Sequence, residues 1–261
     1  MSPYLDWAET TMDGNAAVHA AGIKAMLYSD PNRQAPSDPL YTSDETTFAH
    51  DCTGSRIQGA YQQYLMDPAS SSLRTLWKNW IASQSVGVTW DAIFEDNAND
   101  VLYLPTLPCN YSAGSWLAAA QELNSAQAPT PIIYSGLRID DEKELNVSPN
   151  VIGGLQEGCY SSRDEPKAIK YWALIENNEI AMAQQGKMFL LLWGRHGRRE
   201  QRGRQPAIYL QFISTDIRSG IDRSVGVVRD AFALPRHAGN ASRRSGPTRP
   251  DPERHQRSEA D

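Results

Sequence analysis

The chain has 261 residues, a length typical of one large (β/α)8 barrel, and 40% of them are hydrophobic, enough to form a sizeable core. The formal net charge of −6 argues against a nucleic-acid-binding protein. No uninterrupted run of about 18 apolar residues occurs, so no segment is expected to span a membrane.

Predicted strands and helices alternate along the first 193 residues, which is the signature of parallel β-α-β units. Apolar runs predict strands at Tyr4–Trp7, Ile23–Tyr28, Tyr64–Met66, Asp91–Glu95, Pro131–Tyr134, Val151–Leu155 and Met188–Trp193. Helices are predicted at Asn15–Ala21, Ser70–Ile81, Ser115–Asn124 and Pro166–Gln185, with a long polar loop at Asn32–Gly59. A flavodoxin-like open sheet needs only five or six strands. Seven strands therefore favour a (β/α)8 TIM-type barrel, incomplete at both ends.

The composition changes abruptly after Trp193. Residues 1–193 carry 11 Lys and Arg against 23 Asp and Glu, whereas residues 194–261 carry 14 Arg, no Lys and 8 Asp and Glu. We therefore expect the barrel in residues 1–193 and an Arg-rich tail of low order in residues 194–261. A natural basic tail is one explanation. We favour out-of-frame translation of a GC-rich gene, which yields Arg, Gly, Pro and Ala without Lys.

The N-terminus has neither the basic nor the apolar region of a signal peptide. The chain begins at what looks like the end of a strand, so a start placed too late in a longer gene stays open. An extracytoplasmic location stays open with it, and the sequence does not otherwise fix the localisation.

Three cysteines, Cys52, Cys109 and Cys159, match no metal-ligand spacing. Isolated thiols are the simpler interpretation, and a disulfide between two of them is the alternative, which would require an oxidising compartment. No metal or cofactor is expected, because the glycine-rich loops that cradle nucleotides are absent and the acidic residues of the long loop lack the order of an EF-hand.

Most predicted strand ends carry a carboxylate, and the active site of such a barrel lies at these ends. The carboxylates are Asp30, Asp67, Glu95, Asp96 and Glu157, with Asp6 and Glu9 as further possibilities after the first strand. Asp30 and Asp67 precede prolines, so a role in loop structure or helix capping is at least as good for them. Asp96 and Glu157 are the stronger candidates. Asp96 directly follows an apolar strand, and Glu157 ends a strand whose glycines permit a close approach.

Two carboxylates that face each other across a barrel mouth suit the hydrolysis of a glycosidic bond. One protonates the leaving oxygen, and the other acts as the nucleophile or as the base for water, so their pKa values must differ. Aromatic residues of the same rim are candidates for stacking on sugars: Tyr28, Tyr41, Tyr111, Tyr134, Tyr160 and Trp193.

The sequence resembles uncharacterised glycoside hydrolase barrels that are loosely similar to retaining α-glycosidase barrels. The likeness rests on Asp91–Asn97, Gly153–Tyr160 and Tyr28–Gln34, and it spans about residues 4–193. It implies a carbohydrate substrate, a nucleophilic Asp96 and Glu157 as acid/base. The implied sugar-binding candidates are Asp30, Arg33, Asn97 and Tyr134, to which we add Tyr160.

Other functions stay open. The barrel could bind glycans without catalysis or be a degenerate relative of an enzyme. Aldolase or metal-hydrolase chemistry has weaker support, because no strand ends in Lys and no cluster of His is present. The serines lack the G-x-S-x-G elbow of a serine hydrolase.

Overall fold

The computed structural model describes residues 6–59, 62–98, 104, 106–137, 144–157, 161–162, 165–166, 169–194, 208–213 and 225–227. Its main sheet contains six parallel strands: β1 (Trp7–Thr10), β2 (Lys24–Ser29), β5 (Ala92–Glu95), β6 (Ile132–Ser135), β7 (Val151–Glu157) and β10 (Met188–Gly194). Two antiparallel strands, β11 (Ile208–Ile213) and β12 (Val225–Val227), follow at the β10 edge.

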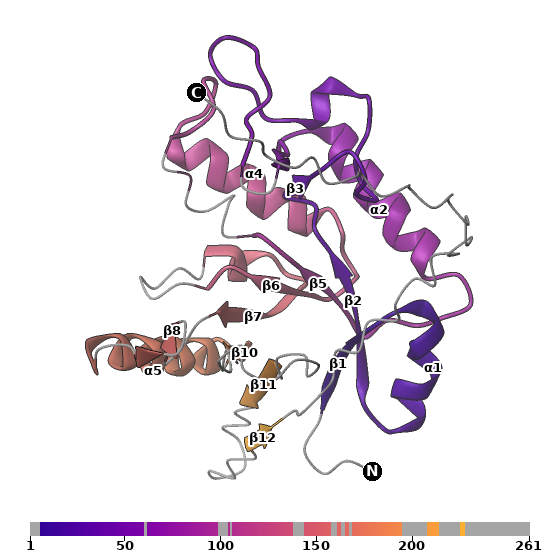
Figure 1. The fold of residues 1–261 in the computed structure, drawn as a ribbon, viewed down its shortest axis with the longest axis vertical. Helices are drawn as coiled ribbons and strands as arrows, with labels where there is room; N and C mark the ends of the chain where they lie inside the picture. Colours follow the sequence, from indigo (N-terminus) through magenta and orange to yellow (C-terminus); the bar gives the residue numbers. More distant parts are fainter. Residues whose placement is uncertain are drawn as a thin grey trace, which may run out of the picture. The chain divides into compact units, whose positions relative to one another are not determined.

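The parallel strands lie in the sheet in the same order as in the chain, from β1 to β10 (Figure 1). A doubly wound open sheet would instead reverse its strand order at a switch point. The sequential order is that of a (β/α)8 barrel, and among the described residues it is incomplete, as predicted. The division at residue 193 stays a prediction, since few residues of the following segment are described.

Helices occupy the connections between the parallel strands. They are α1 (Met12–Ala20), α2 (Ser71–Gln84), α4 (Ala113–Ser125) and α5 (Ile169–Gln184), with the short 3-10 helices η1 (Glu45–Thr47) and η3 (Glu144–Val147). The predicted cap of α2 is confirmed, because Ser70 Oγ accepts a hydrogen bond of 3.2 Å from the Leu73 amide. Figure 1 shows α2 and α4 on the same side of the sheet, and the ion pair between Arg74 and Glu122 joins them.

The third predicted barrel strand is wrong. In place of Tyr64–Met66 the structure has β4 (Tyr64–Leu65), which pairs antiparallel with β3 (Arg33–Gln34) in a separate small sheet. In the main sheet β2 pairs directly with β5. Asp67 is therefore not a barrel strand-end carboxylate. Its Oδ1 accepts hydrogen bonds from the Ala69 amide at 2.9 Å and from the Tyr111 hydroxyl.

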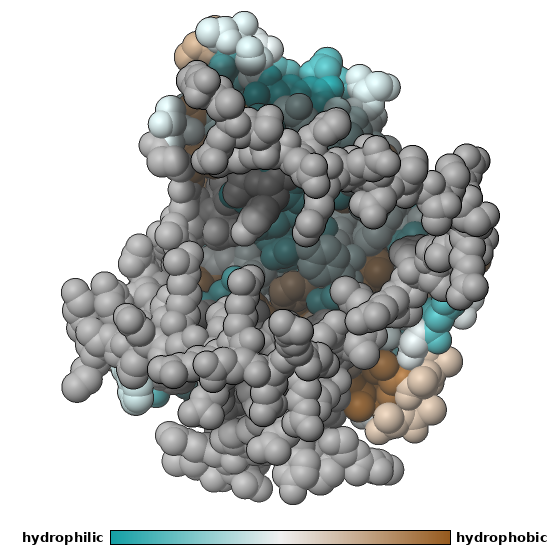
Figure 2. Space-filling model, viewed as in Figure 1, coloured by the Kyte–Doolittle hydropathy of each residue, from teal (hydrophilic) through white to brown (hydrophobic). Residues whose placement is uncertain are grey.

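Residues 31–69, which connect β2 to α2 and are here called the excursion, do not form a polar loop, because they contribute buried side chains to the core on the helix side of the sheet. Leu40, Phe48, Leu65 and Met66 are each at most 3% exposed. A short apolar run buried inside such a loop has the same pattern as a barrel strand, which explains the wrong assignment. Figure 2 shows hydrophilic residues in teal beside paler residues of intermediate hydropathy at the upper edge of the view.

The first strand is also displaced from its prediction. The structure has β1 at Trp7–Thr10 rather than Tyr4–Trp7, whose first two residues lie outside the described part. The shift matters because it places Glu9 within the strand instead of after it. A further pair of two-residue strands, β8 (Ser161–Ser162) and β9 (Glu165–Pro166), follows β7.

The two faces of the parallel sheet carry different sets of buried side chains. On the helix side, Trp77 of α2 and Trp116 of α4 pack in one core with Leu27, Ile93, Tyr134 and Leu191. Alternate residues of a strand point to opposite faces. The other buried apolar residues alternate with those of the helix side and so belong to the barrel interior: Trp7, Met26, Ala92, Ile133, Leu155 and Leu190. By the same alternation Glu9, Asp96 and Glu157 fall on the interior face.

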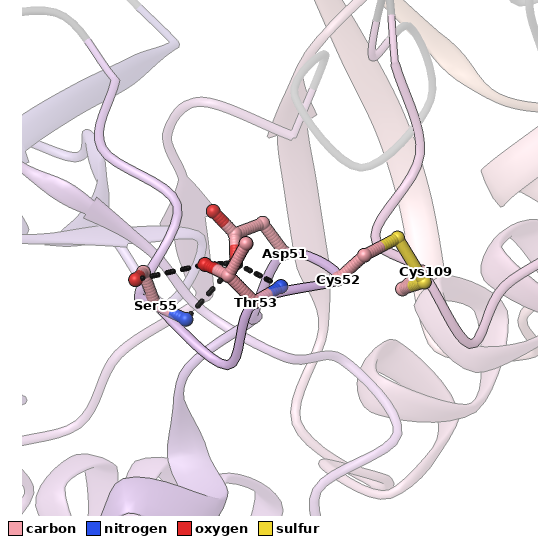
Figure 3. Close-up of a disulfide and its surroundings, with 5 residues drawn as sticks. All are labelled: Asp51, Cys52, Thr53, Ser55 and Cys109. Atoms are coloured by element: carbon pink, nitrogen blue, oxygen red, sulfur yellow. Dashed lines mark hydrogen bonds between the residues drawn. A yellow bond between two sulfur atoms is a disulfide. The ribbon is translucent and has the colours of Figure 1, made fainter.

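A disulfide joins Cys52 of the excursion to Cys109 in the connection between β5 and α4 (Figure 3). Isolated thiols are therefore the wrong interpretation for these two residues, whose Cα atoms lie 4.9 Å apart. Beside the bridge, Asp51 accepts hydrogen bonds from the amides of Thr53 and Ser55 and holds the turn. Cys159 lies outside the described residues.

Among the described residues no helix is both long and apolar enough to cross a membrane.

Candidate functional site

Asp96 is the first residue after β5, and hydrogen bonds fix its carboxylate. Oδ2 accepts a hydrogen bond of 2.7 Å from the Tyr28 hydroxyl, and Oδ1 accepts one of 2.8 Å from the Asn97 amide. The Asp96 amide donates to the Ser29 carbonyl at 2.8 Å, which ties this tip to the end of β2. These contacts hold a half-buried carboxylate in one orientation at the C-terminal ends of two adjacent strands.

Asp30 and Asn97, both predicted to bind sugar, bind each other. Asn97 Nδ2 donates to Asp30 Oδ2 at 2.7 Å, and Asp30 Oδ1 accepts the amides of Asn32 at 3.1 Å and Arg33 at 2.9 Å. Asn97 has a φ of 55°, a left-handed conformation that Asn tolerates better than most residues. Asp30 therefore stabilises the turn that carries Asp96, and sugar binding by this pair stays a prediction.

Glu95 precedes Asp96 but points to the opposite face of the sheet, because neighbouring strand residues alternate. Its side chain is 1% exposed, and Oε1 accepts a hydrogen bond of 3.1 Å from Asn32 Nδ2. The same nitrogen donates to the Asp96 carbonyl at 2.9 Å. Burial raises the pKa of Glu95 to about 7. The two neighbouring acidic residues thus differ in position: Asp96 lies on the interior face of the sheet, and the Glu95 carboxyl is buried on the opposite face.

Glu157 is the last residue of β7. Ser135 at the end of β6 donates from Oγ to Glu157 Oε1 at 3.4 Å. The predicted close approach to the strand glycines is present, and the group that approaches Gly153 is the backbone of the neighbouring strand β10. A Cβ on Gly153 would lie 2.8 Å from the Met188 carbonyl oxygen in β10.

Asp96 couples electrostatically to carboxyl groups on several strands. Burial first, and then the charge of Asp96, raise the pKa of Glu9 to about 7 and also raise the pKa of Glu157. Burial raises the pKa of Asp30 to about 7, with a smaller contribution from Asp96 and an opposing one from its hydrogen bonds. The Tyr28 hydroxyl also has a pKa above its usual value, through burial and its hydrogen bond to Asp96. Glu9, Tyr28, Asp30, Asp96 and Glu157 are here called the acidic cluster.

The remaining predicted residues lie elsewhere. Tyr134 is 0% exposed in the core on the helix side, where its hydroxyl donates to Asn146 Oδ1 at 3.3 Å, so the structure does not bring it to the cluster. Arg33 lies in β3 and contributes its amide to Asp30. Tyr160 lies outside the described residues.

Sequence reasoning missed the specific roles of Tyr28 and Glu9. The sequence indicates Tyr28 only as an aromatic residue for stacking, yet its hydroxyl binds Asp96. It indicates Glu9 only as a possible residue after the first strand. The sequence holds a sign of this role of Glu9, because residues two apart in a strand share one face of the sheet. Glu9 therefore lies on the same face as Trp7, which is the interior face.

No group of three or more His, Cys, Asp and Glu side chains arranged to hold a metal ion occurs in the described part of the chain.

The sequential order of the parallel strands defines the class of the fold, a (β/α) barrel. Among solved structures the chain is similar to a variant of the glycoside hydrolase domain of PelA from Pseudomonas aeruginosa. The TM-score is 0.52 at 10% identity, over 70% of this chain and 74% of that one. It is also similar to Aspergillus fumigatus Ega3 in complex with galactosamine, with a TM-score of 0.51 at 11% identity, over 78% and 83% of the two chains.

At these identities the similarity is one of fold. No family model matches the sequence. No curated protein matches it either.

Proposed function

We propose that the chain is a glycoside hydrolase in which Asp96 is the nucleophile and Glu157 is the acid/base. The observation that carries the proposal is the pairing of a fixed carboxylate, Asp96, with a carboxyl group on the same face whose pKa is raised in part by that carboxylate. A general acid must hold its proton at the working pH, and a neighbouring negative charge favours this. Glycoside hydrolysis requires one carboxyl group that holds a proton and a second one that is ionised.

The reaction follows from these roles. Asp96 attacks the anomeric carbon while Glu157 gives its proton to the leaving glycosidic oxygen, whose bond to that carbon breaks. Water then attacks the anomeric carbon, the bond to Asp96 breaks, and the water proton passes to the Glu157 carboxylate. Positive charge develops on the sugar in both transition states. The negative charge of Asp96, held in place by Tyr28, stabilises it.

We further propose that the substrate contains amine-bearing sugars such as galactosamine units. Ega3, to which the chain is similar in fold, is known in complex with galactosamine. The acidic cluster consists of the carboxyl groups of Glu9, Asp30, Asp96 and Glu157 and the hydroxyl of Tyr28. A protonated amine is attracted to such a cluster, whereas an acidic sugar is repelled.

The test is hydrolysis of aryl α- and β-glycosides and of galactosamine oligosaccharides, with and without N-acetylation. Asp96→Asn should abolish turnover of every substrate. Glu157→Ala should lose activity on oligosaccharides yet retain more on aryl glycosides, whose leaving groups need no proton, and azide should restore turnover by attacking the glycosyl-enzyme. Asp13→Asn, at an exposed position on α1, is the matched control and should behave as wild type.

Undiminished turnover in Asp96→Asn would rule out the assigned nucleophile. A preference for N-acetylated over free-amine oligosaccharides would rule out the proposed substrate class and leave the hydrolase assignment in place.

One observation favours a second function, binding of glycans without catalysis. The described residues supply six parallel strands of the eight in a full barrel. This function predicts oligosaccharide binding that survives the double change Asp96→Asn and Glu157→Gln, with no turnover by wild type. Calorimetry measures the binding, and the absence of turnover by the wild type separates this function from the first proposal.

A further inference from the structure

A pocket of about 140 Å³ adjoins the acidic cluster on the side of the excursion. Tyr28 and Asp30 of the cluster form part of its wall. The excursion contributes Gln34, Asp38 and Gln63, and helix α2 contributes Trp80. An occupant of this pocket would therefore touch the same two residues that hold the Asp96 tip.

Three side chains of the pocket wall have unused polar groups. Asp38 accepts at Oδ2 from the Ala35 amide at 2.7 Å and from Gln63 Nε2 at 3.4 Å, while its Oδ1 makes no hydrogen bond to a described residue. Gln63, whose Nε2 donates to Asp38, and Trp80 also line the pocket, and neither Gln63 Oε1 nor Trp80 Nε1 makes a hydrogen bond to a described residue. The pocket thus offers two oxygen acceptors and an indole, a combination suited to a polar ring with an apolar face.

Gln34, in contrast, is fully used in building the wall. Its Oε1 accepts the Leu40 amide at 2.8 Å, and its Nε2 donates to the carbonyls of Arg33 and Asp30. It is 2% exposed and fixes the start of the excursion against the end of β2. The pocket is therefore a formed part of the fold.

We propose that this pocket is a second sugar subsite, which binds the sugar unit next to the one that Asp96 attacks, on the side away from the cleaved bond; the inference rests on the proposed hydrolase function. The ring of that sugar packs on Trp80, and its hydroxyl or ammonium groups donate to Asp38 and Gln63. The charged residues of the described wall, Asp30 and Asp38, are both acidic. The subsite therefore accepts neutral or amine-bearing units and excludes sugars with carboxylate or sulfate groups.

The test compares an aryl monosaccharide glycoside, which does not reach the second subsite, with an oligosaccharide of the same sugar. In Asp38→Asn and Trp80→Leu, kcat/KM for the oligosaccharide should fall at least about tenfold more than kcat/KM for the aryl glycoside, the loss of roughly one hydrogen bond or one ring contact. Asp13→Asn is again the control and should leave the ratio unchanged. Trp80→Phe keeps a ring and should recover most of the ratio, even if Trp80→Leu lowers stability.

Equal losses on both substrates, or none, would overturn the subsite and leave the hydrolase proposal intact. Wild-type protein that cleaves neither substrate would overturn both. Oligosaccharide binding to the inactive Asp96→Asn protein gives a second readout, and its affinity should fall when Asp38→Asn is added.

Discussion

Replacement of Glu95 by Gln should make the protein more stable at alkaline pH and leave its stability at pH 4 unchanged. Glu95 is 1% exposed, and burial raises its pKa from the ordinary 4.5 to about 7. Below pH 4.5 the group is neutral in both the folded and the unfolded chain. Between pH 4.5 and 7 only the unfolded chain ionises it, so wild-type stability falls as the pH rises. Above pH 7 the loss is constant, at about 3 kcal/mol.

The amide side chain in Glu95→Gln would keep an oxygen to accept the hydrogen bond from Asn32 but has no proton to lose. We therefore expect the free energy of unfolding of Glu95→Gln to exceed that of wild type by about 3 kcal/mol at about pH 8.5, and to match it near pH 4. Urea unfolding at several pH values measures both. Glu9 and Asp30 are unchanged in the variant, so to a first approximation their own titrations cancel in the difference. Asp13→Asn should show no such trend. A difference that does not vary with pH would refute the reasoning.

Three further predictions concern the frame around the site. The double change Cys52→Ser and Cys109→Ser opens a loop closed across 57 residues and should lower the free energy of unfolding by about 4 kcal/mol. Unfolding of the wild type with and without a reductant measures the same loss, and equal stability of the oxidised wild type and the double variant would contradict the prediction. Gly153→Ala should destabilise by about 1–3 kcal/mol, because its Cβ would meet the Met188 carbonyl, whereas the control Gly114→Ala in α4 meets nothing within 4 Å and should be neutral or slightly stabilising. Tyr28→Phe removes the hydrogen bond to Asp96 and should lower kcat about tenfold or more in the glycosidase assay, with little change in the unfolding midpoint; an unchanged kcat would separate this contact from catalysis.

The strands with strong local patterns were predictable. Ala92–Glu95, Ile132–Ser135 and Met188–Gly194 are apolar runs between turn signals, and the structure has strands within one residue of each predicted end. Parallel pairing follows from the helices between them. The carboxylate at the end of β5 could be found in the same way, since the C-terminal ends of parallel strands meet at one edge of the sheet.

Tyr64–Leu65 was not predictable as part of a separate sheet. Its pattern is that of a barrel strand, and only its antiparallel pairing with Arg33–Gln34 distinguishes it. The same limit applies to Asp67, whose position at the end of an apolar run looked like that of Asp96.

The sequence by itself determined the alternation of strands and helices, the acidic strand ends and hence the class of barrel, because these features repeat locally along the chain. Only the tertiary structure decided which carboxyl groups influence one another's pKa. It placed Asp96 against Tyr28, turned Glu95 to the other face and joined Cys52 to Cys109. Such pairings depend on strand register and on contacts between residues far apart in the chain, for which a local pattern carries no information.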